Sequence, residues 1–271
     1  RVVELGDFSG ESGSTQWLPG AGGLQRVLLV GAGDAAEASA KQEQKFCDSV
    51  AKALGTAKAK EALIDLSALP HADEDGSKLP ERLGTALARA LYRYTETLTK
   101  KQDAPALRKV VVAPCDRIST AKVRTALETG FTIGEASSLT SELVNLPGNV
   151  CTPTYLAQQA KKLGRRYNKL KVSVLDEKKM RELGMGSLLS VGHGSDQPSQ
   201  LIIMEYKGGP AKEAPYSLVG KGITFDTGGI SLKPGPKMDE MKFDMGGAGS
   251  VFGAVQAVAE LDLGINLVAI V

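Results

Sequence analysis

The chain has 271 residues, of which 42% are hydrophobic and 24% charged, and 33 Lys and Arg residues nearly balance 31 Asp and Glu residues for a formal net charge of +2. This composition is typical of a soluble globular protein and excludes a chain that is mainly disordered. A protein that wraps a nucleic acid needs a concentrated basic face, so two spare positive charges argue against that class. No apolar run approaches the roughly 20 residues that a membrane span requires.

The length fits two domains or one large one. Cys47, Cys115 and Cys151 are odd in number and too widely spaced for a metal knuckle or a disulfide framework, so we expect reduced cysteines, as in a cytoplasmic protein. The chain has only two histidines, His71 and His193, and a metal site must therefore be built from carboxylates.

Both ends of the sequence look interrupted. The chain opens at Arg1 without an initiator Met or a signal sequence and stops at Val271 within an apolar strand. We therefore expect a fragment of a longer polypeptide.

Short β-branched runs alternate with helical patterns in the first 124 residues. Strands are expected at 26–30, 62–66 and 109–113, and helices at 35–54 and 79–98. This alternation predicts an α/β domain with parallel strands. Apolar residues then recur at helical spacing from 120 to 144 and stop at Leu146-Pro147-Gly148-Asn149, which predicts a connecting helix.

The same pattern restarts after this helix. Helices are expected at 153–167, 177–183 and 247–261, and strands at 171–175, 201–206, 217–219 and 265–271. The sequence therefore predicts an α/β protein in three parts: an amino-terminal α/β domain over 1–124, a connecting helix over 125–149 and a second α/β domain over 150–271.

Two motifs each allow a functional and a purely structural interpretation. Gly31-Ala-Gly33-Asp-Ala-Ala36 follows a strand and matches a dinucleotide-binding pattern, but Asp65 lies too far along the chain to hold the ribose, and the motif also fits an ordinary glycine turn. A basic stretch could contact phosphates or form a solvated helix face. Its residues are Lys161, Lys162, Arg165, Arg166, Lys169 and Lys171.

A more specific segment follows the strand expected at 217–219. Lys221 ends that strand, Asp226 follows after five residues, Lys233 after seven more and Asp244 after eleven more, with two Gly-Gly pairs between or beside them. Paired glycines permit close backbone approach and positive φ angles, and ligands of open α/β sheets bind at the carboxyl ends of strands. The segment therefore predicts a carboxylate metal site. The alternative is two surface ion pairs, Lys221 with Asp226 and Lys233 with Asp244.

This segment, 218–247, resembles the metal-binding signature of the leucyl aminopeptidase family, the cytosolic two-metal aminopeptidases. Similar stretches at 6–10 with 26–31, at 143–156 and at 184–206 extend the resemblance over essentially the whole chain. It implies that the second α/β domain is the first part of a metallo-exopeptidase catalytic domain.

The resemblance also implies roles for single residues around two divalent ions, Mn or Zn, that activate a bridging water. Lys221 would be a ligand as a neutral amine, Asp226 would bridge both ions, and Asp244 would complete the tighter site. Lys233 would polarise the scissile carbonyl and stabilise the oxyanion. Met241 would line the pocket for the substrate's first side chain.

By resemblance, the parent protein is a cytoplasmic homo-hexamer that releases amino-terminal residues, preferring Leu-like ones, from peptides. The family's other metal ligands, and an arginine that holds bicarbonate, would lie beyond Val271, so we expect the chain alone to hold one ion loosely and to be inactive. The alternative function is a nucleotide- or nucleic-acid-binding α/β module that uses the turn at Gly31 or the basic helix around Arg165.

Overall fold

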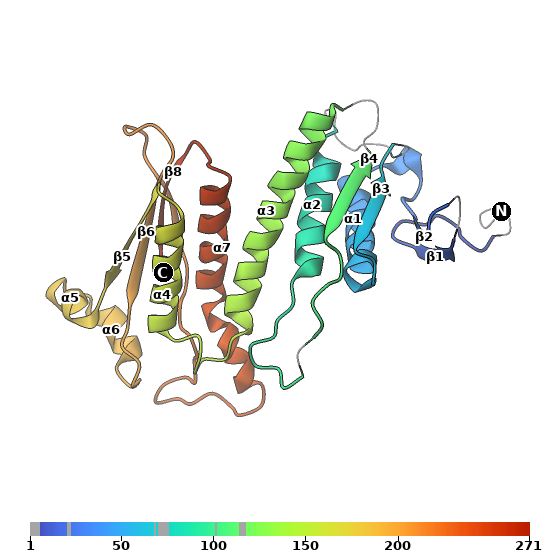
Figure 1. Cartoon of the computed structure of the whole chain (residues 1–271). Coiled ribbons are helices and arrows are strands. Elements are labelled where there is room, and N and C mark those ends of the chain that lie inside the picture. The colour runs from blue at the N-terminus through green and yellow to red at the C-terminus, as the bar shows by residue number, and fades with distance from the viewer. Residues whose placement is uncertain (1–5, 21–22, 68, 70–75, 101, 114–117) are drawn as a thin grey trace. The chain divides into compact units, whose positions relative to one another are not determined.

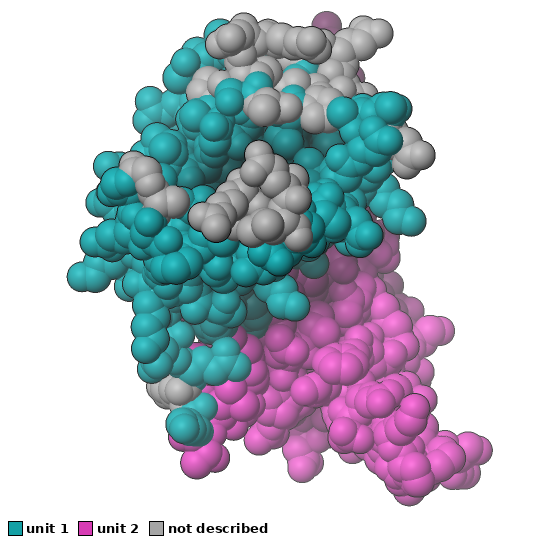
Figure 2. All heavy atoms as spheres, turned by 90° about the vertical axis from the view of Figure 1, so that its right-hand side faces the viewer, with its two compact units in different colours: residues 1–93, 100–135 teal, residues 94–99, 136–271 magenta. Residues whose placement is uncertain are grey.

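The computed structural model describes residues 6–20, 23–67, 69, 76–100, 102–113 and 118–271. His71 and Cys115 lie outside these ranges. The chain divides into two compact units, residues 1–93 with 100–135 and residues 94–99 with 136–271, which Figure 2 colours separately. No described helix is both long and apolar enough to cross a membrane.

The described part of the first unit contains two small sheets, three helices and the first part of the long helix α3 (Thr120–Asn145) (Figure 1). Strands β1 (Thr15–Pro19) and β2 (Arg26–Val30) form an antiparallel pair, and β3 (Glu61–Asp65) and β4 (Lys109–Ala113) form a parallel one. The helices are the short 3-10 helix η1 (Ala35–Glu37), α1 (Ala40–Thr56) and α2 (Lys78–Leu91). The predicted parallel arrangement is therefore right for β3 and β4 and wrong for β2, whose partner is a strand that the sequence analysis missed.

The core of the first unit forms because α1 and α2 each carry an apolar stripe. On α1, Phe46, Val50 and Leu54 recur at helical spacing and are buried, and the Ser39 side chain caps the helix by accepting a hydrogen bond from the Gln42 N–H. The matching stripe on α2 packs with them and with alternate residues of β3 and β4. These α2 residues are Leu79, Leu83, Ala86 and Leu87.

Helix α2 ends at Leu91, seven residues before the predicted end at 98. The reason is the Arg93 guanidinium, which donates hydrogen bonds to the carbonyl oxygens of Ala90 (2.7 Å) and Tyr92 (2.7 Å) at the end of α2. It also reaches the carbonyl of Gly55 near the end of α1, at 2.8 Å. A cation that satisfies terminal carbonyls stabilises a helix end.

Helix α3 (Thr120–Asn145) contributes its first part to the first unit and its last part to the second. The predicted helix over 120–144 is thus present, whereas the three-part division at 124 and 149 stays a prediction. Within the first unit α3 approaches α2 closely: a Cβ added at Gly84 would lie 2.2 Å from the Leu127 carbonyl oxygen. Only glycine permits this separation of the two backbones.

The second unit is built on one mixed sheet in the order β5-β6-β8-β7. The strands are β5 (Leu170–Leu175), β6 (Leu201–Lys207), β7 (Tyr216–Val219) and β8 (Asn266–Ile270). The helices are α4 (Pro153–Arg166), α5 (Glu177–Glu182), α6 (Gly186–Gly192), the 3-10 helix η2 (Met238–Met245) and α7 (Gly246–Glu260). Only β7 and β8 are parallel, and α7 lies between them in the chain.

Burial in the second unit follows the period of two expected of a strand with one covered face. Ile202, Met204 and Tyr206 of β6 are buried, and they share one core with α4 and with Phe252 and Val255 of α7. This packing fixes α7 against the sheet, and the start of α7 is therefore held in a defined place near the end of β7.

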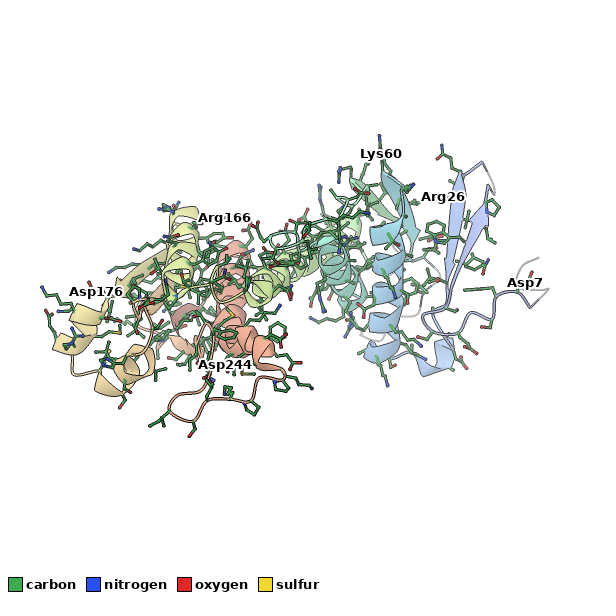
Figure 3. All side chains as sticks on the ribbon, turned by 90° about the horizontal axis from the view of Figure 1, so that it is seen from below. Asp7, Arg26, Lys60, Arg166, Asp176 and Asp244 are labelled. Atoms are coloured by element: carbon green, nitrogen blue, oxygen red, sulfur yellow. The ribbon has the colours of Figure 1, made fainter. Side chains whose placement is uncertain are left out.

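The carboxyl end of α7 is tied to the second unit by a polar cluster. Glu260 accepts a hydrogen bond from Arg166 at 2.8 Å (Arg166 is labelled in Figure 3) and another from the Tyr167 hydroxyl. Asp262 pairs with Lys169 and accepts a hydrogen bond from the Tyr206 hydroxyl at 3.2 Å. The Lys169 contact and then the Tyr206 contact lower the pKa of Asp262.

We predict that Asp262 stabilises the second unit at neutral pH and that this contribution is lost in acid. Because its pKa is lower in the folded state, its contribution is present above the ordinary carboxyl pKa of about 4 and is lost as the pH falls through the folded-state value. Asp262→Asn should therefore lower the melting temperature at neutral pH, and the difference from wild type should shrink as the pH falls below the ordinary carboxyl pKa of about 4. Asn tolerates the positive φ of 49° at this position, as Asp does.

The control for this measurement is Asp196→Asn, which alters an exposed carboxylate in the loop before β6. It should leave the melting temperature close to wild type at every pH. A pH-independent difference for Asp262→Asn would contradict the role assigned to the pair with Lys169.

Candidate metal centre

The five residues predicted to form a site all lie between β7 and α7. Lys221 follows the end of β7, and Asp244 lies on η2 directly before α7, where it is labelled in Figure 3. Asp226 and Lys233 lie in the loop between them, and Met241 lies on η2. The chain reverses in this segment because β7 and β8 are parallel, so α7 must return alongside the sheet.

Lys221 and Asp244 form the first half of the site. The Lys221 Nζ lies 2.6 Å from Asp244 Oδ1. Asp244 is the more enclosed of the two, with 18% of its side chain exposed against 56% for Lys221. The Lys221 backbone is held as well, because its carbonyl accepts a hydrogen bond from the Ala248 N–H at 2.9 Å. The end of β7 is therefore fastened to the first turn of α7.

Asp226 and Lys233 form the second half. Asp226 Oδ1 accepts a hydrogen bond from the Gly228 N–H at 2.8 Å, and the Lys233 Nζ lies 3.2 Å from Oδ2. The Gly228 hydrogen bond, then Lys233 and with a smaller effect Lys221, lower the pKa of Asp226. The turn requires glycine at position 228, where φ is +97° and an added Cβ would lie 2.5 Å from the Ser231 carbonyl oxygen.

The ion pairs differ from those considered in the sequence analysis. The surface-pair alternative joined Lys221 to Asp226 and Lys233 to Asp244, whereas the structure pairs Lys221 with Asp244 and Lys233 with Asp226. The difference arises because η2 carries Asp244 back to the end of β7, while the tight turn at Gly228 brings Lys233 back to Asp226. The Lys233 N–H donates to the Thr227 carbonyl at 2.9 Å across this turn.

A second oxygen of Asp244 indicates that this half of the site can hold a cation. Oδ2 is buried and has no hydrogen-bond partner in the described part of the chain. A buried carboxylate oxygen without a partner is costly, and a bound cation removes that cost. A lysine amine binds a metal only in its neutral form, and the neighbouring Lys221 would supply such a nitrogen ligand. The two side chains therefore fit a divalent ion.

Within the described residues no group of three or more His, Cys, Asp and Glu side chains gathers to hold a metal. The candidate set consists of two carboxylates, Asp226 and Asp244, with one lysine amine. The Lys221 amine lies beside one of these carboxylates, Asp244, and is the candidate nitrogen ligand of the set.

Met241 lies three residues before Asp244 on η2 and is half-buried. A 3-10 helix has about three residues per turn, so residues three apart lie on the same side. The thioether of Met241 therefore belongs to the same side of η2 as the Asp244 carboxylate. An apolar, adaptable side chain in that place can contact an aliphatic group.

The two other motifs do not form comparable sites. At the Gly31 turn, α1 begins only at Ala40, and the preceding strand β2 belongs to an antiparallel pair, unlike the parallel unit of a dinucleotide fold. In the basic stretch, Arg166 and Lys169 are engaged by Glu260 and Asp262. The structure thus favours the structural interpretation of both motifs.

Comparisons with known proteins identify the class. Residues 138–271 match the model of the cytosol aminopeptidase family, catalytic domain, and residues 1–101 match the model of the same family's N-terminal domain. The chain belongs to the cytosol aminopeptidase family. The sequence-based resemblance and the mixed α/β class are therefore confirmed.

Individual relatives agree with this assignment. A probable cytosol aminopeptidase of Pseudomonas fluorescens is 45% identical over 271 residues, which cover 99% of this chain and 54% of the relative. The cytosol aminopeptidase of Pseudomonas aeruginosa is 46% identical over 269 residues, which cover 98% and 54%. The chain spans about half the length of the curated relatives it matches.

Two solved structures are also similar. The bottromycin maturation enzyme BotP in complex with Mn has a TM-score of 0.84 at 30% identity, over 98% of this chain and 55% of BotP. A mutant of tomato leucine aminopeptidase has a TM-score of 0.80 at 27% identity, over 99% of this chain and 51% of the tomato protein.

Proposed function

We propose that the whole protein is a metal-dependent aminopeptidase and that the segment between β7 and α7 supplies part of its metal centre. The observation that carries the proposal is the buried, unpartnered Asp244 Oδ2 beside the Lys221 amine. The family assignment and the Mn complex of BotP support it. Two divalent ions, Mn or Zn, would activate a water and polarise the peptide carbonyl when bound.

The residues of this chain would have different roles in metal binding and in peptide hydrolysis. Lys221 and Asp244 would hold one ion, and Asp226 would contact both ions. Lys233 would place its ammonium group beside the peptide carbonyl oxygen and stabilise the negative charge that develops there. Met241 provides an apolar wall that selects Leu-like first side chains.

Further properties are proposed from the family alone. These are a homo-hexameric assembly in the cytoplasm, peptides as substrates, and a bicarbonate held by residues outside this chain. The segment between β7 and α7 would contribute three ligands, and on this proposal the chain is inactive without the family's other ligands.

The bridging role of Asp226 predicts a contrast between two variants of the whole protein. Asp226→Ala should empty or severely weaken both ion sites, whereas Asp244→Ala should chiefly weaken one. Counting ions per subunit by mass spectrometry after dialysis measures this difference. Equal metal loss in the two variants would remove the bridging assignment, even if both lacked activity.

Lys221→Arg separates a metal ligand from an ion pair. Arginine keeps the positive charge but has no lone pair to donate, so the variant should lose the tighter ion and nearly all peptidase activity while the protein stays folded. An ordinary ion pair with Asp244 would survive, because a guanidinium pairs with a carboxylate at least as well. A variant with normal metal content and turnover would return Lys221 to a structural role.

Lys233→Ala tests a role in the reaction without a role in metal binding. Loss of an oxyanion-stabilising group should lower kcat for a leucyl substrate on the order of 100-fold or more. The ion content should not change. Loss of an ion with normal turnover per remaining metal would show that Lys233 is a ligand instead.

A further inference from the structure

Two glycines face each other where the end of β7 meets the beginning of α7. Gly220 directly precedes Lys221, and Gly247 is the second residue of α7. A Cβ added at Gly220 would lie 2.7 Å from the Gly247 carbonyl oxygen and 2.9 Å from the Ala248 nitrogen. A Cβ added at Gly247 would lie 2.9 Å from the Lys221 nitrogen. At each of the two glycines, the space that a Cβ would need is therefore occupied by the backbone of the opposite segment.

Neither backbone can retreat at low cost. Gly220 belongs to the sheet, since its N–H donates to the Ile270 carbonyl at 2.9 Å. On the other side, Ala248 and Phe252 of α7 are fully buried in the core of the second unit. A close-packed interior transmits the displacement that an added methyl group would cause, because it has no free space to absorb it. A methyl group at Gly247 would therefore push against the backbone of Lys221, and a methyl group at Gly220 would push the first turn of α7 away from the end of β7.

We infer that Gly220 and Gly247 are positioning residues for the metal centre: by letting α7 touch the end of β7, they set the place from which Lys221 reaches the ion beside Asp244. The inference rests on the proposed function and deepens it. A hydrogen bond from the Ala248 N–H to the Lys221 carbonyl also joins the start of α7 to the end of β7. This bond can form only because the two glycines let the backbones come so close.

The neighbouring Gly246 provides a matched control. It is the first residue of α7, and an added Cβ would meet nothing within 4 Å. Both Gly246→Ala and Gly247→Ala replace glycine by alanine in the first turn of one helix, where alanine is the better helix former. They differ in the contact with Lys221.

The experiment measures Mn²⁺ affinity by titration calorimetry on the metal-depleted whole protein, together with the melting temperature. Gly247→Ala and Gly220→Ala should each lower the affinity for the tighter ion by about 10- to 100-fold, the loss typical of a residue that orients a ligand. Gly246→Ala should bind Mn²⁺ as wild type does. Mn²⁺ affinity unchanged in folded Gly247→Ala and Gly220→Ala would overturn the inference, and so would unfolding of both variants, since it would assign the contact to folding alone.

A double-mutant cycle with Lys221→Met identifies the route of the effect. If Gly247 acts through Lys221, then Gly247→Ala should cost no further Mn²⁺ affinity once Lys221→Met has removed the amine. An equal loss in both backgrounds would show that the glycine acts elsewhere and would overturn the positioning role. Separately, Lys221→Met with wild-type Mn²⁺ affinity would overturn the proposed ligand itself, so the two failures are distinguishable.

Discussion

The parallel pairing of β7 with β8 is the constraint from which the arrangement of the candidate site follows. Two parallel neighbours cannot be joined by a tight turn, so the chain must leave the end of β7, cross the sheet and return. Here the return is α7, and its buried face fixes where it begins. A strand end and a helix start are thereby placed together, and residues 23 positions apart in the chain, Lys221 and Asp244, come within 2.6 Å.

The polar part of the site depends on this apolar packing. The sheet and α7 share a core in which Met204, Phe252 and Val255 are fully buried, and the burial of such side chains stabilises a fold by roughly 1.5–3 kcal/mol each. The loop between β7 and α7 contributes little of that kind, since Ile230 and Leu232 are exposed. The protein can therefore keep Asp244 Oδ2 on η2 without a partner, because the core of the unit supplies the stability.

Much of the fold could be predicted from the sequence, because most elements are amphipathic and well separated by turn residues. Strand β4 and the helix α3 lie within a residue of their predicted bounds. Strand β1 was missed because its residues are mostly exposed and show no alternation. The early end of α2 depends on Arg93 reaching Gly55 on another helix, and the antiparallel partners of β6 depend on long-range pairing. Local patterns carry neither kind of information.

For the candidate site, the sequence indicated which residues to consider but not which of them pair. The spacing of lysines, aspartates and paired glycines singled out the segment in which the structure brings Lys221 to Asp244 and Lys233 to Asp226. The pairing of lysines with aspartates depends on the turn at Gly228 and on the 3-10 helix η2. Both are too short to show a periodic pattern in the sequence. The Gly-Gly pair at the start of α7 was a visible signal in the sequence, but the contact of Gly247 with Gly220 is defined only by the fold.

The long connection between β7 and β8 has a kinetic consequence for the candidate centre. Lys221 and Asp244 lie 23 residues apart in the chain, and α7 directly follows the Asp244 segment and packs in the core of the second unit. Contacts between residues that are distant in the chain form slowly, because the entropy of loop closure is lost before the contact can compensate it. We therefore expect the contact between Lys221 and Asp244 to form only once α7 has packed on the sheet.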